Sequence, residues 1–109
     1  MAITANVDLG NGATASSCYI IVPYAYVKKF RTEKEGVDST IKLIYEVDIY
    51  QNKSAADTLN MDERLNKRII CREVDHFKID YDIGASDNPF VLAYTHLKTN
   101  GSLSSVADA

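Results

Sequence analysis

The run of residues 40–50 constrains the fold of this chain more than any other segment, because apolar and polar side chains alternate along it. Alternation is the period of a β-strand that buries one face. One face carries Ile41, Leu43, Tyr45, Val47 and Ile49, and the other carries Lys42, Glu46 and Asp48. Large apolar side chains along a whole face need a second layer of structure to cover them. The run therefore predicts one long strand at the centre of the core.

Further segments alternate in polarity or are rich in β-branched and aromatic residues, and we expect a strand in each of them: 3–9, 18–22, 24–31, 65–74 and 77–83. Residues 32–36 predict an exposed, charged turn. Residues 52–64 are polar and lack periodicity, which predicts a long loop with one helical turn at 54–59.

A single helix is predicted near the C-terminus, after Gly84. Pro89 suits the first helical position because its missing N–H would have no partner there, and Asn88 or Asp87 can cap the exposed amides. The apolar face follows the spacing i, i+3, i+4 and i+7, with Phe90, Ala93, Tyr94 and Leu97. Asn100 and Gly101 predict a left-handed exit from the helix.

The number and order of these elements predict a mainly β fold. We expect a small antiparallel β-sandwich or barrel of about six strands with one C-terminal α-helix, and a single α+β sheet is the alternative. A chain of 109 residues is expected to form one β-rich domain over residues 1–109. Within it, residues 1–9 are a possible extended arm or edge strand, and residues 102–109 are expected to be a flexible tail.

Charge and hydropathy exclude several classes of protein. A net charge of -3 and a pI near 5.2 argue against nucleic acid as a partner, since that affinity comes largely from clustered Lys and Arg. The longest apolar runs, such as 19–22, are far too short to span a bilayer, so no membrane partner is expected. The first residues lack the basic and apolar regions of a secretory signal, so we expect no export by that route.

No grouping of side chains predicts catalysis. His76 beside Asp75 fits a turn that faces water, and His96 lies at the boundary of the apolar helix face. The carboxylates of Asp80 and Asp82 lack the ligand spacing of a calcium loop, and no HExxH spacing supports zinc. Cys18 and Cys71 lie far apart in strand-like runs and are expected to be buried thiols. We therefore expect no enzyme, no catalytic residue, no cofactor, no metal and no small-molecule substrate.

Residues 81–99 carry a more specific pattern. It consists of Tyr81-Asp82-Ile83-Gly84, Asn88-Pro89 and Ala93-Tyr94-x-His96-Leu97-Lys98-Thr99. This pattern resembles the C-terminal signature of a family of small tailed-bacteriophage proteins, which are encoded among virion genes. The resemblance implies a structural component of the virion, a tail, baseplate, neck or head-decoration subunit that acts through assembly with other subunits. It also implies synthesis in the bacterial host cytoplasm and either self-association or other virion proteins as partners.

Candidate interface residues follow from residue type. The chain has seven tyrosines and no tryptophan, and tyrosine is frequent at protein interfaces. We expect outward aromatic and basic residues to meet carboxylates of a neighbouring subunit, although solvated strand faces with edge-protecting lysines would give the same pattern. The candidates are Tyr24, Tyr26, Lys28, Tyr50, Arg64, Arg68, Arg72, Asp80 and Asp82. The alternative function is a monomeric module that binds carbohydrate or a host protein through its tyrosines and the 52–64 loop.

Overall fold

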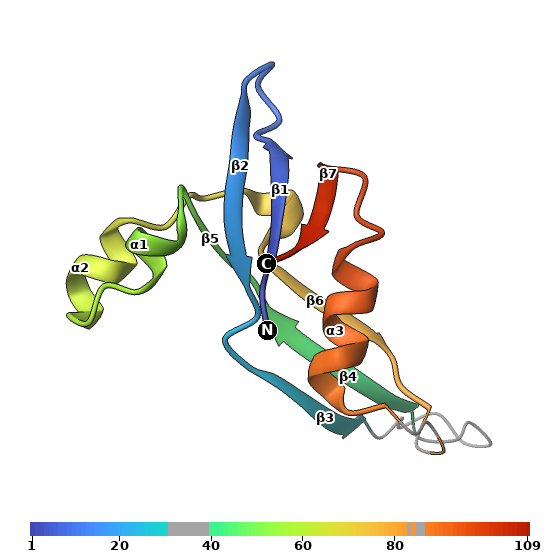
Figure 1. The fold of residues 1–109 in the computed structure, drawn as a ribbon. Coiled ribbons are helices and arrows are strands. Elements are labelled where there is room, and N and C mark those ends of the chain that lie inside the picture. Colours follow the sequence, from blue (N-terminus) through green and yellow to red (C-terminus); the bar gives the residue numbers. More distant parts are fainter. Residues whose placement is uncertain (31–39, 83, 85–86) are drawn as a thin grey trace.

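The computed structural model describes residues 1–30, 40–82, 84 and 87–109. The predicted turn at 32–36 and the strand position of Ile83 lie outside these residues. The described chain forms two antiparallel sheets (Figure 1). Sheet A has the order β5 (Asp48–Tyr50), β2 (Thr14–Ile21), β1 (Ile3–Asp8) and β7 (Leu103–Asp108). Sheet B has the order β3 (Ala25–Phe30), β4 (Thr40–Glu46) and β6 (His76–Asp80).

The helices are α1 (Lys53–Ala56), α2 (Met61–Asn66), the short 3₁₀ helix η1 (Arg72–Val74) and α3 (Pro89–Leu97). The predicted mainly β class with a helix near the C-terminus is therefore confirmed, and the alternative of a single sheet is wrong. Among the helices of the described residues, none is long and apolar enough to cross a bilayer.

One long, bent ribbon joins the two sheets. β2 pairs with β5 in sheet A, from Tyr19 opposite Tyr50, and the same two stretches of chain continue as β3 paired with β4 in sheet B. The predicted strand 40–50 is thus two strands with a bend at Val47, whose N–H donates to the Asp75 carbonyl at 2.8 Å. The alternation persists through the bend, since four of the five predicted inward residues are buried, namely Leu43, Tyr45, Val47 and Ile49, and Ile41 is partly buried.

Both chain ends belong to sheet A, which corrects two predictions. Residues 1–9 are neither an arm nor an edge, because β1 lies between β2 and β7. Residues 102–109 are not a flexible tail, because 103–108 form β7 and Leu103 is buried in the core. Ser105 has φ +52° at the shift in register between β1 and β7. This bulge interrupts the alternation of β7, so the sequence pattern of a strand is hidden.

The predicted strand 65–74 is also wrong. Asn60 caps α2 through its side chain, which accepts the Glu63 N–H, and this helix takes up the start of the segment. Between α2 and η1, only Arg68 forms a β-bridge, opposite Tyr50. The single helical turn predicted at 54–59 lies instead at α1, with Asn52 as its cap. Apolar content favoured a strand here, but the two Asn caps decide the local structure.

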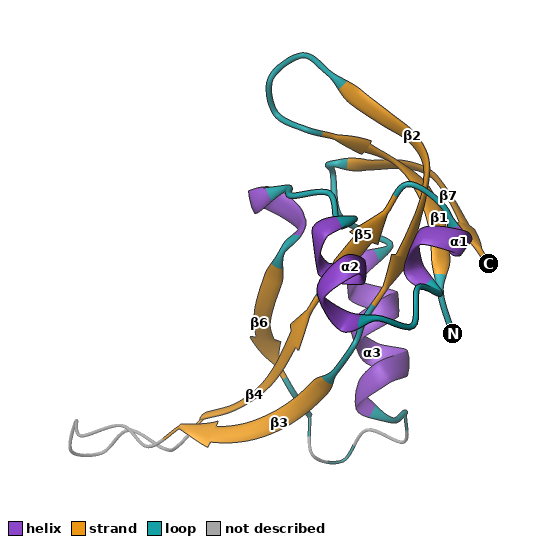
Figure 2. Cartoon of the chain, turned by 90° about the vertical axis from the view of Figure 1, so that its left-hand side faces the viewer, coloured by secondary structure: helices purple, strands orange, loops and turns teal. Residues whose placement is uncertain are grey.

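Helix α3 lies across one face of sheet B (Figure 2). Its predicted start is confirmed, since Asn88 accepts the Val91 N–H and Pro89 opens the helix. The left-handed exit is wrong, because positive φ within the described ranges occurs only at Gly10, Gly12, Ser17 and Ser105. Ala93, Tyr94 and Leu97 are buried, whereas Phe90, predicted to be core, is 42% exposed.

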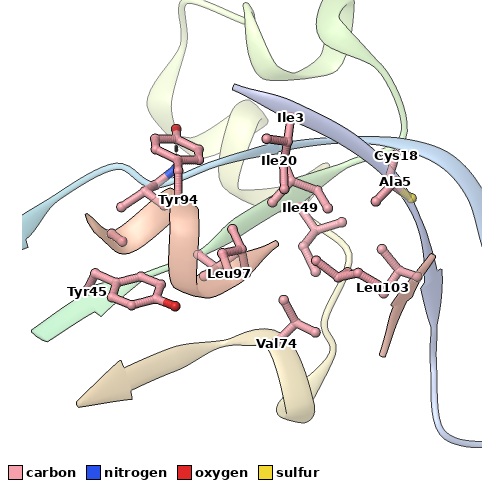
Figure 3. Close-up of a cluster of buried hydrophobic side chains, with 14 of the residues drawn as sticks. Ile3, Ala5, Cys18, Ile20, Tyr45, Ile49, Val74, Tyr94, Leu97 and Leu103 are labelled. Atoms are coloured by element: carbon pink, nitrogen blue, oxygen red, sulfur yellow. Dashed lines mark hydrogen bonds between the residues drawn. The ribbon is translucent and has the colours of Figure 1, made fainter. Parts of the chain in front are cut away.

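The Tyr94 hydroxyl ties α3 to two other parts of the chain. It accepts the Val22 N–H at 2.8 Å and donates to the Met1 carbonyl at 2.8 Å. The first bond is drawn in Figure 3, where Tyr94 and Leu97 lie among the buried side chains of both sheets. The helix therefore closes the core at the point where the ribbon leaves sheet A.

Candidate interaction surface

Sheet B has an inner face that packs on the core and an outer face that points away from α3. Leu43 and Tyr45 belong to the inner face and join the core cluster with Leu97. Because side chains alternate across a sheet, their neighbours in sequence and register share the other side. The outer face therefore consists of Tyr24, Tyr26, Lys28, Phe30, Lys42, Ile44, Glu46, His76, Lys78 and Asp80.

The register arranges these side chains in rows across the strands. The middle row is Tyr26, Ile44 and Lys78, and one neighbouring row is Lys28, Lys42 and Asp80. In the row on the other side, Glu46 pairs with His76, and Tyr24 lies next to Glu46, whose carboxylate raises the pKa of Tyr24.

Two tyrosines form the aromatic part of the outer face. Tyr24 and Tyr26 are 42% and 46% exposed, and their rings stack with centroids 6.0 Å apart. A hydrogen bond to the Glu46 carboxylate, with smaller effects of burial and charge, raises the pKa of Tyr24 to about 12. Both rings are held in place and accessible, which suits an interface, because tyrosine offers a large contact area and loses few rotamers on binding.

The lysines of the outer face gather toward one of its two ends. At one end, which we call the lysine end, the ammonium groups of Lys28 and Lys78 lie 5.1 and 4.7 Å from the centroid of the Phe30 ring. Lys42 forms an ion pair with Asp80 in the same region.

At the opposite end, which we call the carboxylate end, lie Glu46 and the start of β6. There Asp75 lies 3.3 Å from the ring of His76. Exposed polar contacts of this kind add little to the stability of a folded chain.

The inner side of the sheet is rigidly backed. The Tyr45 hydroxyl oxygen lies 2.5 Å from Nδ1 of His96 on α3, and Phe77 packs against both rings at centroid distances of 5.1 and 5.4 Å. Burial raises the pKa of Tyr45 well above its ordinary value. His96, expected at the boundary of the apolar helix face, therefore fixes α3 to the sheet that carries the outer face.

The structure brings four of the predicted interface residues together, since Tyr24, Tyr26, Lys28 and Asp80 all lie on the outer face. Sequence alternation indicated that Lys42, Glu46 and Lys78 point outward. Alternation could not reveal that these side chains lie in rows across three strands, because the rows depend on how the strands pair.

The prediction that Tyr50 is an interface residue is wrong, because Tyr50 is only 1% exposed. Arg64 and Arg68 lie near it: burial raises the pKa of Tyr50, and the two guanidinium groups act in the opposite direction. Arg68 also pairs with Asp48 at 3.2 Å. These arginines therefore contact their own chain between α2 and β5, away from the outer face.

The last two candidates also lie elsewhere. Arg72 is exposed on η1, and Asp82 follows β6 and accepts the Gly84 N–H at 2.9 Å. A separate group of exposed apolar side chains accompanies α1 and α2, which stand to one side of the molecule in Figure 1. The group comprises Leu59, Met61, Leu65 and Ile70.

Elsewhere in the part of the chain that the structure describes, few side chains could take part in chemistry. Cys18 and Cys71 are free, buried thiols, as predicted, and burial raises the pKa of each. Over residues 1–30, 40–82, 84 and 87–109 there is no pocket, and no cluster of His, Cys, Asp and Glu is placed to hold a metal ion. Comparisons with protein-family models, with curated protein sequences and with solved structures found no match.

Proposed function

We propose that this protein is a structural subunit of a tailed-bacteriophage particle, and that it acts by binding other subunits through the outer face of sheet B. The observation that carries the association is the exposed Tyr24 and Tyr26 pair, on a face that has a lysine end and a carboxylate end. Aromatic anchors flanked by complementary charges are the usual composition of a specific protein interface.

The rigidity of the sheet supports the same function. Tyr45, Phe77 and His96 pack between β4, β6 and α3, so the outer face is held on a fixed frame. A surface that is already ordered loses less conformational entropy on association than a loop does. Repeated assembly of identical subunits benefits from such a surface, because every contact forms with the same geometry.

The particle assignment rests on the resemblance of residues 81–99 to the phage family. Ala93, Tyr94 and Leu97 of that pattern are buried, and His96 contacts Tyr45. The side chains of the pattern thus secure the helix behind the outer face. The protein is then made in the bacterial host cytoplasm and resides in the virion.

Peptide mass spectrometry of purified phage particles tests the assignment. We expect peptides of this chain at an abundance comparable to that of other structural proteins, and retained after washing in high salt. Detection only in lysate, with none in particles of the phage that encodes the chain, would contradict a structural role in the virion.

A carbohydrate-binding module is the second candidate, and the stacked Tyr24 and Tyr26 rings favour it, because exposed aromatic rings can stack on sugars. This function requires a monomer whose glycan binding depends on both rings. A glycan array probed with the wild type, Tyr24→Ala and Tyr26→Ala separates the two functions. Binding that is lost in both variants supports the module, and the absence of binding by the wild type rejects it.

A further inference from the structure

We propose that the partner of the outer face is a second copy of this chain, docked face to face about a two-fold axis that runs along the middle row. This inference rests on the proposed function and names the subunit that is bound. It follows from the pattern of charge on the outer face. Two copies of this face bring opposite charges together at its centre only when they dock in certain relative orientations.

A two-fold axis along the middle row fixes which rows meet. The axis lies in the plane between the two sheets, across their strands, so it exchanges the row on one side of the middle row with the row on the other. Glu46 of one copy then faces Lys42 of the second copy. His76 likewise faces Asp80 of the second copy. Opposite charges meet at the position of Glu46 and Lys42, the His76 ring can hydrogen bond to the Asp80 carboxylate at the other position, and each contact occurs twice because the interface is isologous.

The aromatic residues fit the same arrangement. Tyr24 faces Lys28 of the second copy, where a cation–π contact can form. Tyr26 and Ile44 lie on the axis row and meet their own equivalents, which places apolar surface at the centre. Apolar centres with charged rims are typical of specific interfaces.

Lys78 lies on the axis row and so faces Lys78 of the second copy, but its ammonium group is not directed at the axis. That group reaches to 4.7 Å from the centroid of the Phe30 ring, at the lysine end. It is therefore directed toward the region that receives the carboxylate end of the second copy. Its charge supports the docking instead of opposing it.

The alternative face-to-face axis, along β4, is less favourable at its centre. It leaves each row on itself and exchanges β3 with β6, so Lys42 meets Lys42 and Glu46 meets Glu46 at the centre, while Lys28 meets Asp80 and Tyr26 meets Lys78 at the edges. Juxtaposed like charges oppose association. The central like-charge contacts thus favour the axis along the middle row over the axis along β4, within the roughly 30° by which packed sheets rotate relative to each other.

The size of the outer face sets the expected strength. A standard interface uses about 20–30 residues a side, and the outer face offers fewer. We therefore expect a weak, concentration-dependent dimer with a dissociation constant in the micromolar range or above, of the order of 1 μM to 1 mM. Multivalent contacts in a particle would strengthen so weak a contact.

Sedimentation equilibrium of the full chain tests the proposal by charge exchange. The variants are Glu46→Lys, Lys42→Glu and the double variant with both changes. Each single change places like charges opposite each other twice, so each should weaken dimerisation about tenfold or more. The double variant restores opposite charges and should dimerise within a few-fold of the wild type. Glu63→Lys, exposed on α2, makes the same charge change away from the outer face and should have no effect.

Circular dichroism of each variant confirms that the chain is folded before its association is scored. A wild type that stays monomeric at about 1 mM, or a folded double variant that associates no better than the single variants, overturns the second copy as partner. If the chain stays monomeric but is found in purified particles, the proposed function stands and only this inference is rejected. A dimer with the predicted charge dependence, in a chain absent from particles, supports this inference and rejects the particle assignment.

Discussion

At the residue scale, the Tyr94 hydroxyl is the polar group on which the closure of the core depends most. It bonds both the Val22 N–H and the Met1 carbonyl, in a side chain that is 4% exposed. Tyr94→Phe leaves the buried Val22 N–H without an acceptor, and we expect it to lower the free energy of unfolding by about 1–3 kcal/mol. Urea unfolding measures the change. Tyr26→Phe is the control, since its exposed hydroxyl should contribute little, and equal stability of the two variants would contradict the assigned role.

A second residue-scale prediction concerns alkaline pH. Burial raises the pKa of Tyr45 above the ordinary 10.0, so between that value and its folded pKa the unfolded chain loses a proton that the folded chain keeps. The stability associated with Tyr45 is therefore complete below pH 10 and falls as pH rises above it, by up to about 1.4 kcal/mol per pH unit.

Denaturant unfolding at a series of pH values between 9 and about 11.5 tests this dependence. Tyr45→Phe should show a shallower fall than the wild type, whatever its stability at neutral pH, because the residue that resists ionisation is gone. Identical slopes for the two proteins would show that Tyr45 titrates normally in the folded state.

Sequence periodicity predicted the residues that lie in the middle of an element better than those at its ends. Tyr94 and Leu97 are buried as the helical spacing indicated, whereas Phe90, in the first turn of α3, is exposed. Periodicity predicts the side to which a side chain points, but it does not predict whether another part of the chain covers that side chain. Tyr50 shows the converse, because α2 and Arg68 cover a residue that the strand pattern left outside.

At the element scale, β7 is the strand that the sequence concealed. The bulge at Ser105 and the small side chains of 104–108 remove the alternation that marks a strand. The pairing partner, β1, lies about a hundred residues earlier in the chain, and no local pattern encodes that distance. By contrast, the alternation of 40–50 predicted the buried face of both β4 and β5, although not the bend between them.

Deleting residues 103–109 tests the role of β7. The deletion removes buried Leu103 and leaves one edge of β1 unpaired, so we expect the free energy of unfolding to fall by at least about 3 kcal/mol. The thermal midpoint, followed by circular dichroism, should drop or the transition should lose cooperativity. Ser104→Ala, on the exposed side of β7, should leave the midpoint unchanged. A truncated chain as stable as the wild type would mean that 102–109 is a dispensable tail.

At the scale of the whole molecule, the two sheets that the bent ribbon joins have different roles. Sheet A holds both chain ends together, and α3 closes the core against the inner face of sheet B. The outer face of sheet B is then presented on a rigid support. Sequence reasoning named four of its residues, and it missed the complementary ends because these appear only when three strands are set in register.

Cross-linking of single cysteine variants tests most directly that the outer face is the association surface. Lys78→Cys lies on the middle row, so in the docked pair the two introduced thiols face each other across sheets about 10 Å apart. Lys29→Cys lies on the same sheet but on the other side, and the native thiols are buried. With a short bis-maleimide reagent, we predict covalent dimers from Lys78→Cys and few from Lys29→Cys. Equal yields from the two variants, or dimers from Lys29→Cys alone, would contradict the account.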